Sequence, residues 1–326
     1  MTDINVANVH VGVVGLGLMG SSIVVALLVA GHHVEAIAPL KQELENAPRH
    51  IHDHLMQCER AGLLNKPIAD YLNKLKVSDD YGALSDCLMV LECVTERPEI
   101  KKQVYQKIGG AVSAQTIIAS NTSAIPISIL QTYVPDPERF LGIHWAEPAY
   151  MTRFLEITCG ALTRLSFAEW AFELAHHWGK EPTLLKKDIR GFVTNRLMYA
   201  VYREGLTLAD NGDATIEDMD KAFRYDAGSW MTLMGVFRRM DYLGLDDLEI
   251  TLKNTFPLLN NTDVVPLAMQ KMIDIQAKGT QTSTGFYNYN GNEARKWDEA
   301  FAEFNKDIDK LAAQYPSKSN RINNKL

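Results

Sequence analysis

Apolar residues in the N-terminal half of the chain gather in short runs that alternate with amphipathic stretches. The run from Val9 to Val14 is rich in β-branched residues, and a helical stretch that reaches Ala30 separates it from a second run, His33 to Ala38. This order predicts a β-α-β unit. Further strand-like runs, separated by helical stretches such as Pro98 to Ile108, are Leu75 to Ser78, Leu88 to Val94, Thr116 to Ser120 and Phe140 to His144. The alternation predicts an α/β fold with a doubly wound parallel sheet.

From about Arg190 onward the pattern changes. Strand signals fade and long amphipathic stretches replace them, for example Asn195 to Asp210 and Ile216 to Phe223. This periodicity predicts an all-helical C-terminal domain, which we place at residues 190–326, after an α/β domain at residues 1–189.

Composition narrows the classes of partner. The formal charge of −7 over 326 residues argues against nucleic acid or an anionic membrane as the main partner, because both select basic surfaces. The apolar run Ile23 to Ala30 is too short to span a bilayer, so we expect no membrane segment. The four cysteines are scattered without a CxxC spacing, which favours a reduced, cytoplasmic protein.

A glycine-rich turn follows the first apolar run and opens the first helical stretch. Gly15 suits a tight turn, Gly17 a close approach of backbone to ligand, and Gly20 helix packing. A helix N-terminus at this place would face the phosphates of a dinucleotide. The context predicts a Rossmann-type domain that binds NAD, with the cofactor held by Gly15, Leu16, Gly17, Leu18, Met19 and Gly20.

The end of the second strand-like run lacks the acidic residue that usually holds the adenosine ribose. Position 38 is alanine, and Glu35 lies inside the run, where a structural role is expected. No arginine is present there to favour a 2′-phosphate, and Lys41 is the nearby cation. The usual carboxylate therefore gives no support for NAD over NADP. The glycine turn makes NAD the expected cofactor, with NADP as the alternative.

His144 and Glu156 form a candidate proton-transfer pair. A carboxylate fixes the tautomer of an imidazole and stabilises its charged form, so the pair can take or give a proton near neutral pH. Taken alone, His144 could simply end a strand and Glu156 could be a surface charge. The glycine turn, residues 121–123 and His144 all fall at the expected carboxyl ends of strands, which favours a shared site.

Several separated segments together resemble the L-3-hydroxyacyl-CoA dehydrogenase family. They are GLGLMG (15–20), LECVTERPEIKKQVY (91–105), ASNTS (119–123), GIHWAEP (142–148), FLEI (154–157), GFVTNRL (191–197), MDYLGLD (240–246) and TGFYNY (284–289). The resemblance implies an NAD-binding first domain and a helical second domain that closes the cleft and forms a homodimer, in an enzyme of fatty acid metabolism.

The resemblance also implies residue roles. His144 is the expected general base and Glu156 its partner, while Ser123 and Asn195 hydrogen-bond the substrate. Glu96 and Lys101 match family positions that contact the cofactor side of the site.

Departures from the family pattern leave the substrate open. Glu147 stands near the expected nicotinamide position, where the family has asparagine. Its negative charge either favours the charged form of His144 or binds a hydrogen-bond donor on an unusual substrate. The third alternative is that Glu147 points into solvent. The stretch 230–237, WMTLMGVF, resembles relatives that oxidise small acids, such as gulonate and carnitine dehydrogenases, although helical core packing explains it equally well. His50, His52 and His54 lie close to Asp53 in the sequence, but we expect them to bind no metal. No nearby thiol or second carboxylate completes a ligand set.

The sequence therefore predicts an NAD(P)-dependent oxidoreductase that acts on a secondary alcohol beta to a carbonyl, like the 3-hydroxyacyl-CoA dehydrogenases. One alternative is a dehydrogenase of a small hydroxy acid or sugar acid without coenzyme A. A second alternative is a dinucleotide-binding sensor without turnover, which the joint presence of Ser123, His144, Glu156 and Asn195 disfavours.

Overall fold

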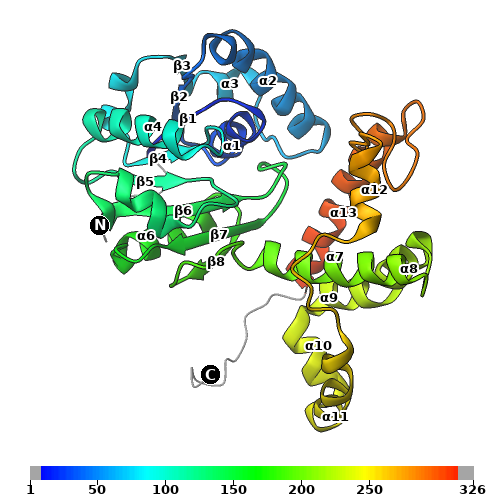
Figure 1. The fold of residues 1–326 in the computed structure, drawn as a ribbon. Helices are drawn as coiled ribbons and strands as arrows, with labels where there is room; N and C mark the ends of the chain where they lie inside the picture. Colours follow the sequence, from blue (N-terminus) through cyan, green and yellow to red (C-terminus); the bar gives the residue numbers. More distant parts are fainter. Residues whose placement is uncertain (1–8, 315–326) are drawn as a thin grey trace. The chain divides into compact units, whose positions relative to one another are not determined.

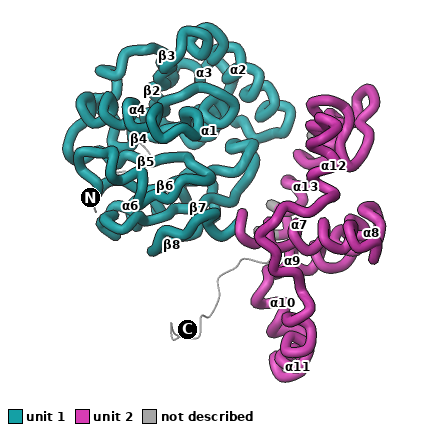
Figure 2. Tube along the Cα trace, in the orientation of Figure 1, with its two compact units in different colours: residues 1–194 teal, residues 195–326 magenta. Residues whose placement is uncertain are grey.

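The computed structural model describes residues 9–314. The chain divides between Thr194 and Asn195 into two compact units, which Figure 2 colours separately. Unit 1 is an α/β structure and unit 2 is helical (Figure 1), so the predicted fold class is confirmed.

An eight-stranded sheet forms the centre of unit 1, in the order β3-β2-β1-β4-β5-β6-β7-β8. All neighbouring strands are parallel except β6 and β7, which are antiparallel. The order reverses at β1, whose neighbours are β2 and β4, and a crevice at such a switch point is where open α/β sheets bind ligands. The strands are β1 (His10–Val14), β2 (His33–Ile37), β3 (Leu75–Ser78), β4 (Met89–Glu92), β5 (Ile117–Ser120), β6 (Phe140–Trp145), β7 (Phe154–Cys159) and β8 (Glu181–Leu185).

Alternate strand residues enter two separate apolar clusters. In β1, Val11 and Val13 belong to the cluster that contains residues of α1, α2 and α6, whereas Val14 belongs to the cluster that contains residues of α4 and α5. Helices therefore cover both faces of the sheet (Figure 1), as a doubly wound fold requires. The helices of unit 1 are α1 (Leu18–Val29), α2 (Lys41–Arg60), α3 (Ile68–Leu72), α4 (Pro98–Ala111), α5 (Ile127–Leu130) and α6 (Leu165–His177), with short 3₁₀ turns η2 (Tyr81–Asp86), η3 (Gln131–Tyr133) and η4 (Pro137–Arg139).

The strands β7 and β8 were not among the predicted strands, and they make the sheet mixed. Five of the six residues of β7 are buried, including Glu156, so the strand shows no polar alternation that would mark it in the sequence. The strand β8 carries Pro182 next to Glu181, a combination that weakens strand propensity and is tolerated at the edge of a sheet.

Unit 2 consists of helices, and the predicted helices at 195–210 and 216–223 are confirmed within one residue or two by α7 and α8. The hydroxyl of Thr215 caps α8 by accepting a hydrogen bond from the N–H of Asp218 (3.1 Å). Within residues 9–314, no helix is both long and apolar enough to cross a membrane. The elements are α7 (Thr194–Asn211), α8 (Ile216–Ala222), η5 (Phe223–Ala227), α9 (Gly228–Met234), α10 (Val236–Leu243), α11 (Leu245–Thr255), η6 (Phe256–Leu258), α12 (Leu267–Asp274) and α13 (Glu293–Gln314).

The glycines of the turn between β1 and α1 have different reasons to be glycine. Gly15 has φ +95°, a conformation that favours glycine, and a Cβ on Gly20 would lie 1.8 Å from the carbonyl oxygen of Gly15. A Cβ on Gly17 would meet nothing within 4 Å. The fold therefore requires Gly15 and Gly20, whereas no atom of residues 9–314 requires Gly17.

We predict that Gly20→Ala destabilises the protein and that Gly17→Ala does so much less. The methyl group of the first variant must displace backbone, which costs about 1–3 kcal/mol, whereas that of the second enters open space. Urea and thermal denaturation of the two variants measure the difference. Equal loss of stability in both would contradict this account of the turn.

Candidate active site

The strands β5 and β6 bring two polar segments to the same edge of the sheet. Ser120 ends β5 and pairs in register with Gly142 of β6, and residues 121–123 follow β5 directly. The side chain of Asn121 accepts a hydrogen bond from the N–H of Trp145 at the end of β6 (2.9 Å). Asn121 therefore ties the loop after β5 to the end of β6, and sequence reasoning had assigned it no individual role.

His144 and Glu156 are directly opposite each other on the antiparallel strands β6 and β7. The imidazole Nδ1 lies 2.9 Å from the Oε2 atom of Glu156. The side chain of Glu156 is completely buried, whereas that of His144 remains 15% exposed. The pair predicted from the sequence is thus in contact, with its carboxylate shielded and its imidazole accessible.

The carboxylate of Glu156 has a second set of partners. Its Oε1 atom accepts hydrogen bonds from the backbone N–H groups of Val193 (2.8 Å) and Thr194 (3.1 Å). Burial alone raises the pKa of Glu156, but the hydrogen bonds from His144, Thr194 and Val193 outweigh it, and the net pKa shift is downward. Glu156 therefore stays charged at neutral pH, because every contact it makes favours the anion.

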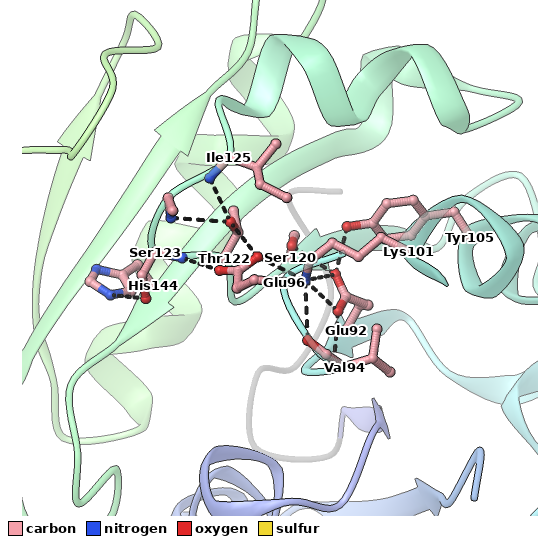
Figure 3. A network of polar contacts seen from close by, with 11 residues as sticks. Glu92, Val94, Glu96, Lys101, Tyr105, Ser120, Thr122, Ser123, Ile125 and His144 are labelled. Atoms are coloured by element: carbon pink, nitrogen blue, oxygen red, sulfur yellow. Dashed lines mark hydrogen bonds and ion pairs between the residues drawn. The ribbon is translucent and has the colours of Figure 1, made fainter. Parts of the chain in front are cut away.

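The other imidazole nitrogen faces Ser123. The distance from Nε2 of His144 to Oγ of Ser123 is 3.1 Å (Figure 3). Because Nδ1 donates its hydrogen to Glu156, Nε2 of the neutral ring carries the lone pair, and the Ser123 hydroxyl donates to it. A substrate hydroxyl at this position meets a ready proton acceptor.

Phe192 fixes the imidazole from one side. Its ring centroid lies 5.5 Å from that of His144, and the residue is 2% exposed. Phe192 has φ 49°, in the left-handed region that bulky residues rarely adopt. This backbone conformation immediately precedes the two N–H groups that bind Glu156, so the turn both packs on the base and anchors its partner. The sequence motif GFVTNRL does not by itself indicate this role.

Glu96 positions the loop that carries Ser123. Its Oε1 accepts from the backbone N–H of Ser123 (2.7 Å), and its Oε2 accepts from the hydroxyl of Thr122 (3.0 Å). Figure 3 shows Glu96 between Ser123 and the cluster around Lys101. The structure thus gives Glu96 a part in orienting Ser123, in addition to the cofactor contact that the resemblance implies.

Lys101 is buried in an ion-pair network. Its side chain is 1% exposed and its ammonium lies 2.7 Å from Oε1 of the fully buried Glu92 and 3.5 Å from Oε2 of Glu96. The hydroxyls of Tyr105 and Ser120 also donate to Glu92 (2.5 and 2.8 Å; Figure 3). The ammonium of Lys101 faces Glu92 and Glu96, so Lys101 supports the loop of Ser123 through Glu96. A direct contact of Lys101 with the cofactor stays a prediction. A carboxylate inside the otherwise apolar strand β4 was the signal that could have identified Glu92.

The turn from Gly15 to Gly20 fits a dinucleotide pyrophosphate. No side chain caps the N-terminus of α1, so its N–H groups and the positive end of the helix dipole are available to an anion. The open space at Gly17 is what a close-lying phosphate requires. Leu18 and Met19 begin the helix. The backbone N–H of Leu16 is held by the Oε2 atom of Glu43 (3.3 Å).

Glu147 and Asn195 are the two remaining residues that were predicted for the site. Glu147 follows β6 and is exposed, although burial of its carboxyl raises its pKa while a hydrogen bond from Ser22 of α1 opposes the shift. Asn195 stands in the first turn of α7, one residue after Thr194, and opens unit 2. The roles of both residues stay predictions. Nδ1 of His54, one of the three histidines considered as metal ligands, lies 3.1 Å from the hydroxyl of Tyr150.

Several known proteins are similar in sequence over most of the chain. A 5-formyl-3-hydroxy-2-methylpyridine 4-carboxylate 5-dehydrogenase from Mesorhizobium japonicum is 29% identical over 88% of this chain and 92% of its own. An L-carnitine dehydrogenase from Oceanobacillus iheyensis is 32% identical over 72% of this chain and 76% of its own. The mitochondrial hydroxyacyl-coenzyme A dehydrogenase of Sus scrofa is 27% identical over 86% of this chain and 91% of its own.

A solved structure is similar over nearly the whole length. It is the crystal structure of an NAD⁺-dependent 5-formyl-3-hydroxy-2-methylpyridine 4-carboxylic acid 5-dehydrogenase, with a TM-score of 0.85 and 27% identity over 93% of this chain and 97% of that one. Residues 10–189 match the NAD-binding domain of 3-hydroxyacyl-CoA dehydrogenase, and residues 191–289 match its C-terminal domain. These matches confirm the expected NAD cofactor and oxidoreductase class. The chain belongs to the 3-hydroxyacyl-CoA dehydrogenase family.

Proposed function

We propose that the protein oxidises the hydroxyl group of a 3-hydroxyacyl-CoA to the ketone, and catalyses the reverse reduction, with His144 as the proton-transfer group. The observation that supports this most is the hydrogen-bonded series Ser123, His144 and Glu156, which ends on a buried carboxylate. It lies in the unit that carries the NAD-binding domain.

Oxidation of a secondary alcohol breaks an O–H bond and a C–H bond. NAD, when bound, accepts the hydride from carbon. Nε2 of His144 takes the hydroxyl proton, and the N–H that forms is the same one that returns the proton when the ketone is reduced. Ser123 hydrogen-bonds the reacting oxygen and orients it toward the imidazole, and Asn195 is proposed as its second substrate-facing partner.

Glu156 makes the proton transfer favourable. The positive imidazolium that forms lies 2.9 Å from a carboxylate that is charged and has no access to water. Attraction between opposite charges is stronger in such a shielded place than in solution. Because the N–H groups of Val193 and Thr194 hold Oε1, Oε2 stays aimed at Nδ1 throughout the cycle.

We predict that His144→Gln lowers kcat/KM by a factor of about 10²–10⁴ and leaves the affinity for NADH unchanged. Steady-state kinetics with acetoacetyl-CoA measure the first quantity, and quenching of protein fluorescence by NADH measures the second. His52→Gln is the matched control, because His52 is an exposed histidine of α2. Retention of full turnover by His144→Gln would rule out this mechanism.

Oxidation of a free hydroxy acid or sugar acid is the second candidate function. Glu147 favours it, because a carboxylate in place of asparagine beside the catalytic strand suits a substrate with an additional hydrogen-bond donor or a positive charge. The named activities of two relatives, on L-carnitine and on a pyridine carboxylate, are consistent with such substrates.

A panel of substrates separates the two candidates. We expect turnover of acetoacetyl-CoA with NADH, and competition by free coenzyme A. Small hydroxy acids, sugar acids and carnitine, each tested with NAD and NADP, form the comparison set. Turnover of a free acid together with no activity on acetoacetyl-CoA would favour the second candidate over the first.

We also propose that the protein is a homodimer. Among the described residues of unit 2, Gly228 alone is buried, and large apolar side chains such as Phe237 (80% exposed) and Leu258 (81%) face outward. Apolar surface on this scale is typical of a face that a partner subunit covers. The C-terminal family domain is therefore proposed to serve assembly.

Sedimentation equilibrium tests the dimer. We expect a species of twice the chain mass at micromolar concentration, and we expect Phe237→Glu to shift the equilibrium toward monomer. Glu249→Gln, an exposed change on α11, is the control. A wild-type protein that stays monomeric at 100 times higher concentration would contradict the proposal.

A further inference from the structure

The end of β2 offers no negative charge to a cofactor. Ala38 follows the strand, is 1% exposed, and donates its N–H to the carbonyl oxygen of Ser78 (2.8 Å). In a dinucleotide-binding domain, an acidic residue at this place usually accepts hydrogen bonds from the adenosine ribose and discriminates against a 2′-phosphate. This chain must obtain both effects from another residue or do without them.

A carboxylate reaches the neighbouring glycine turn from α2. The Oε2 atom of Glu43, in the first turn of that helix, accepts a hydrogen bond from the backbone N–H of Leu16 (3.3 Å). Leu16 stands between Gly15 and Gly17, next to the position whose missing Cβ leaves open space. Glu43 is half-buried, so its position is restrained while the residue stays partly exposed.

Neighbouring groups show that this charge lies close to the carboxyl edge of the sheet. Tyr81 follows β3, and burial together with the charges of Glu43 and Glu92 raises the pKa of Tyr81 to about 12. The hydroxyl of Tyr81 is buried and has no hydrogen-bond partner among the described residues. The hydrogen bond to Leu16 places Glu43 beside the end of β1, and its charge also acts on Tyr81, which follows β3.

We infer that Glu43 replaces the missing strand-end acid: it accepts the hydroxyl groups of the adenosine ribose and selects NAD over NADP. One oxygen is fixed by Leu16, and the carboxylate keeps acceptor capacity for two hydroxyl donors. A 2′-phosphate at the same place would bring two negative groups together, which is unfavourable at any dielectric constant. The inference rests on the proposed function, because it assumes NAD in this turn.

The nearby cation does not offset this charge. Lys41 is 89% exposed and its ammonium lies 3.9 Å from Glu45, at the outer limit of an ion pair. Such an exposed lysine contributes little to holding a phosphate in a fixed position. The balance of charge around the turn therefore favours a ribose diol.

The test compares Glu43→Gln with the wild type by isothermal titration calorimetry, with NADH and with NADPH. Glutamine keeps a side-chain oxygen for the N–H of Leu16 and removes only the charge. We expect the affinity for NADH to fall about tenfold and that for NADPH to stay or rise, since hydrogen bonds to charged groups are the stronger ones. Glu45→Gln, on the exposed side of the same helix, is expected to leave the ratio of the two affinities unchanged.

Adenosine fragments place the effect at the ribose. Adenosine 5′-monophosphate should bind Glu43→Gln more weakly than it binds the wild type. The affinity of adenosine 2′,5′-bisphosphate, compared with that of the monophosphate, should be higher in Glu43→Gln than in the wild type. Should the Gln variant fail to fold, Glu43→Ala removes the carboxylate entirely, and its affinity for NADPH relative to NADH must rise; an unchanged ratio overturns the inference.

Two further outcomes are decisive. If Glu43→Gln weakens NADH and NADPH by the same factor, Glu43 merely shapes the turn, and the inference fails while the proposed function stands. If the wild type binds neither dinucleotide, the proposed function fails as well.

Discussion

The antiparallel pairing of β6 with β7 is the constraint on which the catalytic geometry depends. All other neighbouring strands of this sheet are parallel, and a parallel partner would have needed a crossover to reach the same edge. The short return after β6 instead places His144 and Glu156 opposite each other in register. Two side chains on one face of such a pair have adjacent Cβ atoms, so backbone hydrogen bonds, and not loop conformation, set the distance between base and carboxylate.

Two buried carboxylates, Glu92 and Glu156, are neutralised in opposite ways. Glu92 accepts from Lys101, Tyr105, Ser120 and the N–H of Val94, so its charge is fully compensated at all times. Glu156 has two backbone N–H groups and an imidazole, and receives a full positive charge only when that ring is protonated. The first arrangement makes a rigid support for the loop of Ser123, and the second makes a site whose electrostatic energy changes during the reaction.

Local patterns in the sequence were sufficient for much of this structure. The strands β1 to β6, the glycine turn and the change to helices near residue 190 follow from periodicity and turn residues. The contact of His144 with Glu156 was predicted, but its cause was not, because β7 is buried on both faces and gives no alternating signal. Glu92, Asn121 and Glu43 were missed because their importance arises from long-range contacts, between residues 9 to 28 positions apart, that no local pattern encodes.

Phe192 meets two requirements that oppose each other. Its positive φ favours glycine, whereas its buried ring against His144 requires a large apolar side chain. A glycine would relax the backbone but remove the wall behind the imidazole, and a β-branched residue would fill space but resist the left-handed conformation. The position therefore tolerates few alternatives in its amino-acid identity, although its side chain carries no group that transfers a proton. Backbone conformation and packing together constrain such a site, and a search for reactive groups does not detect it.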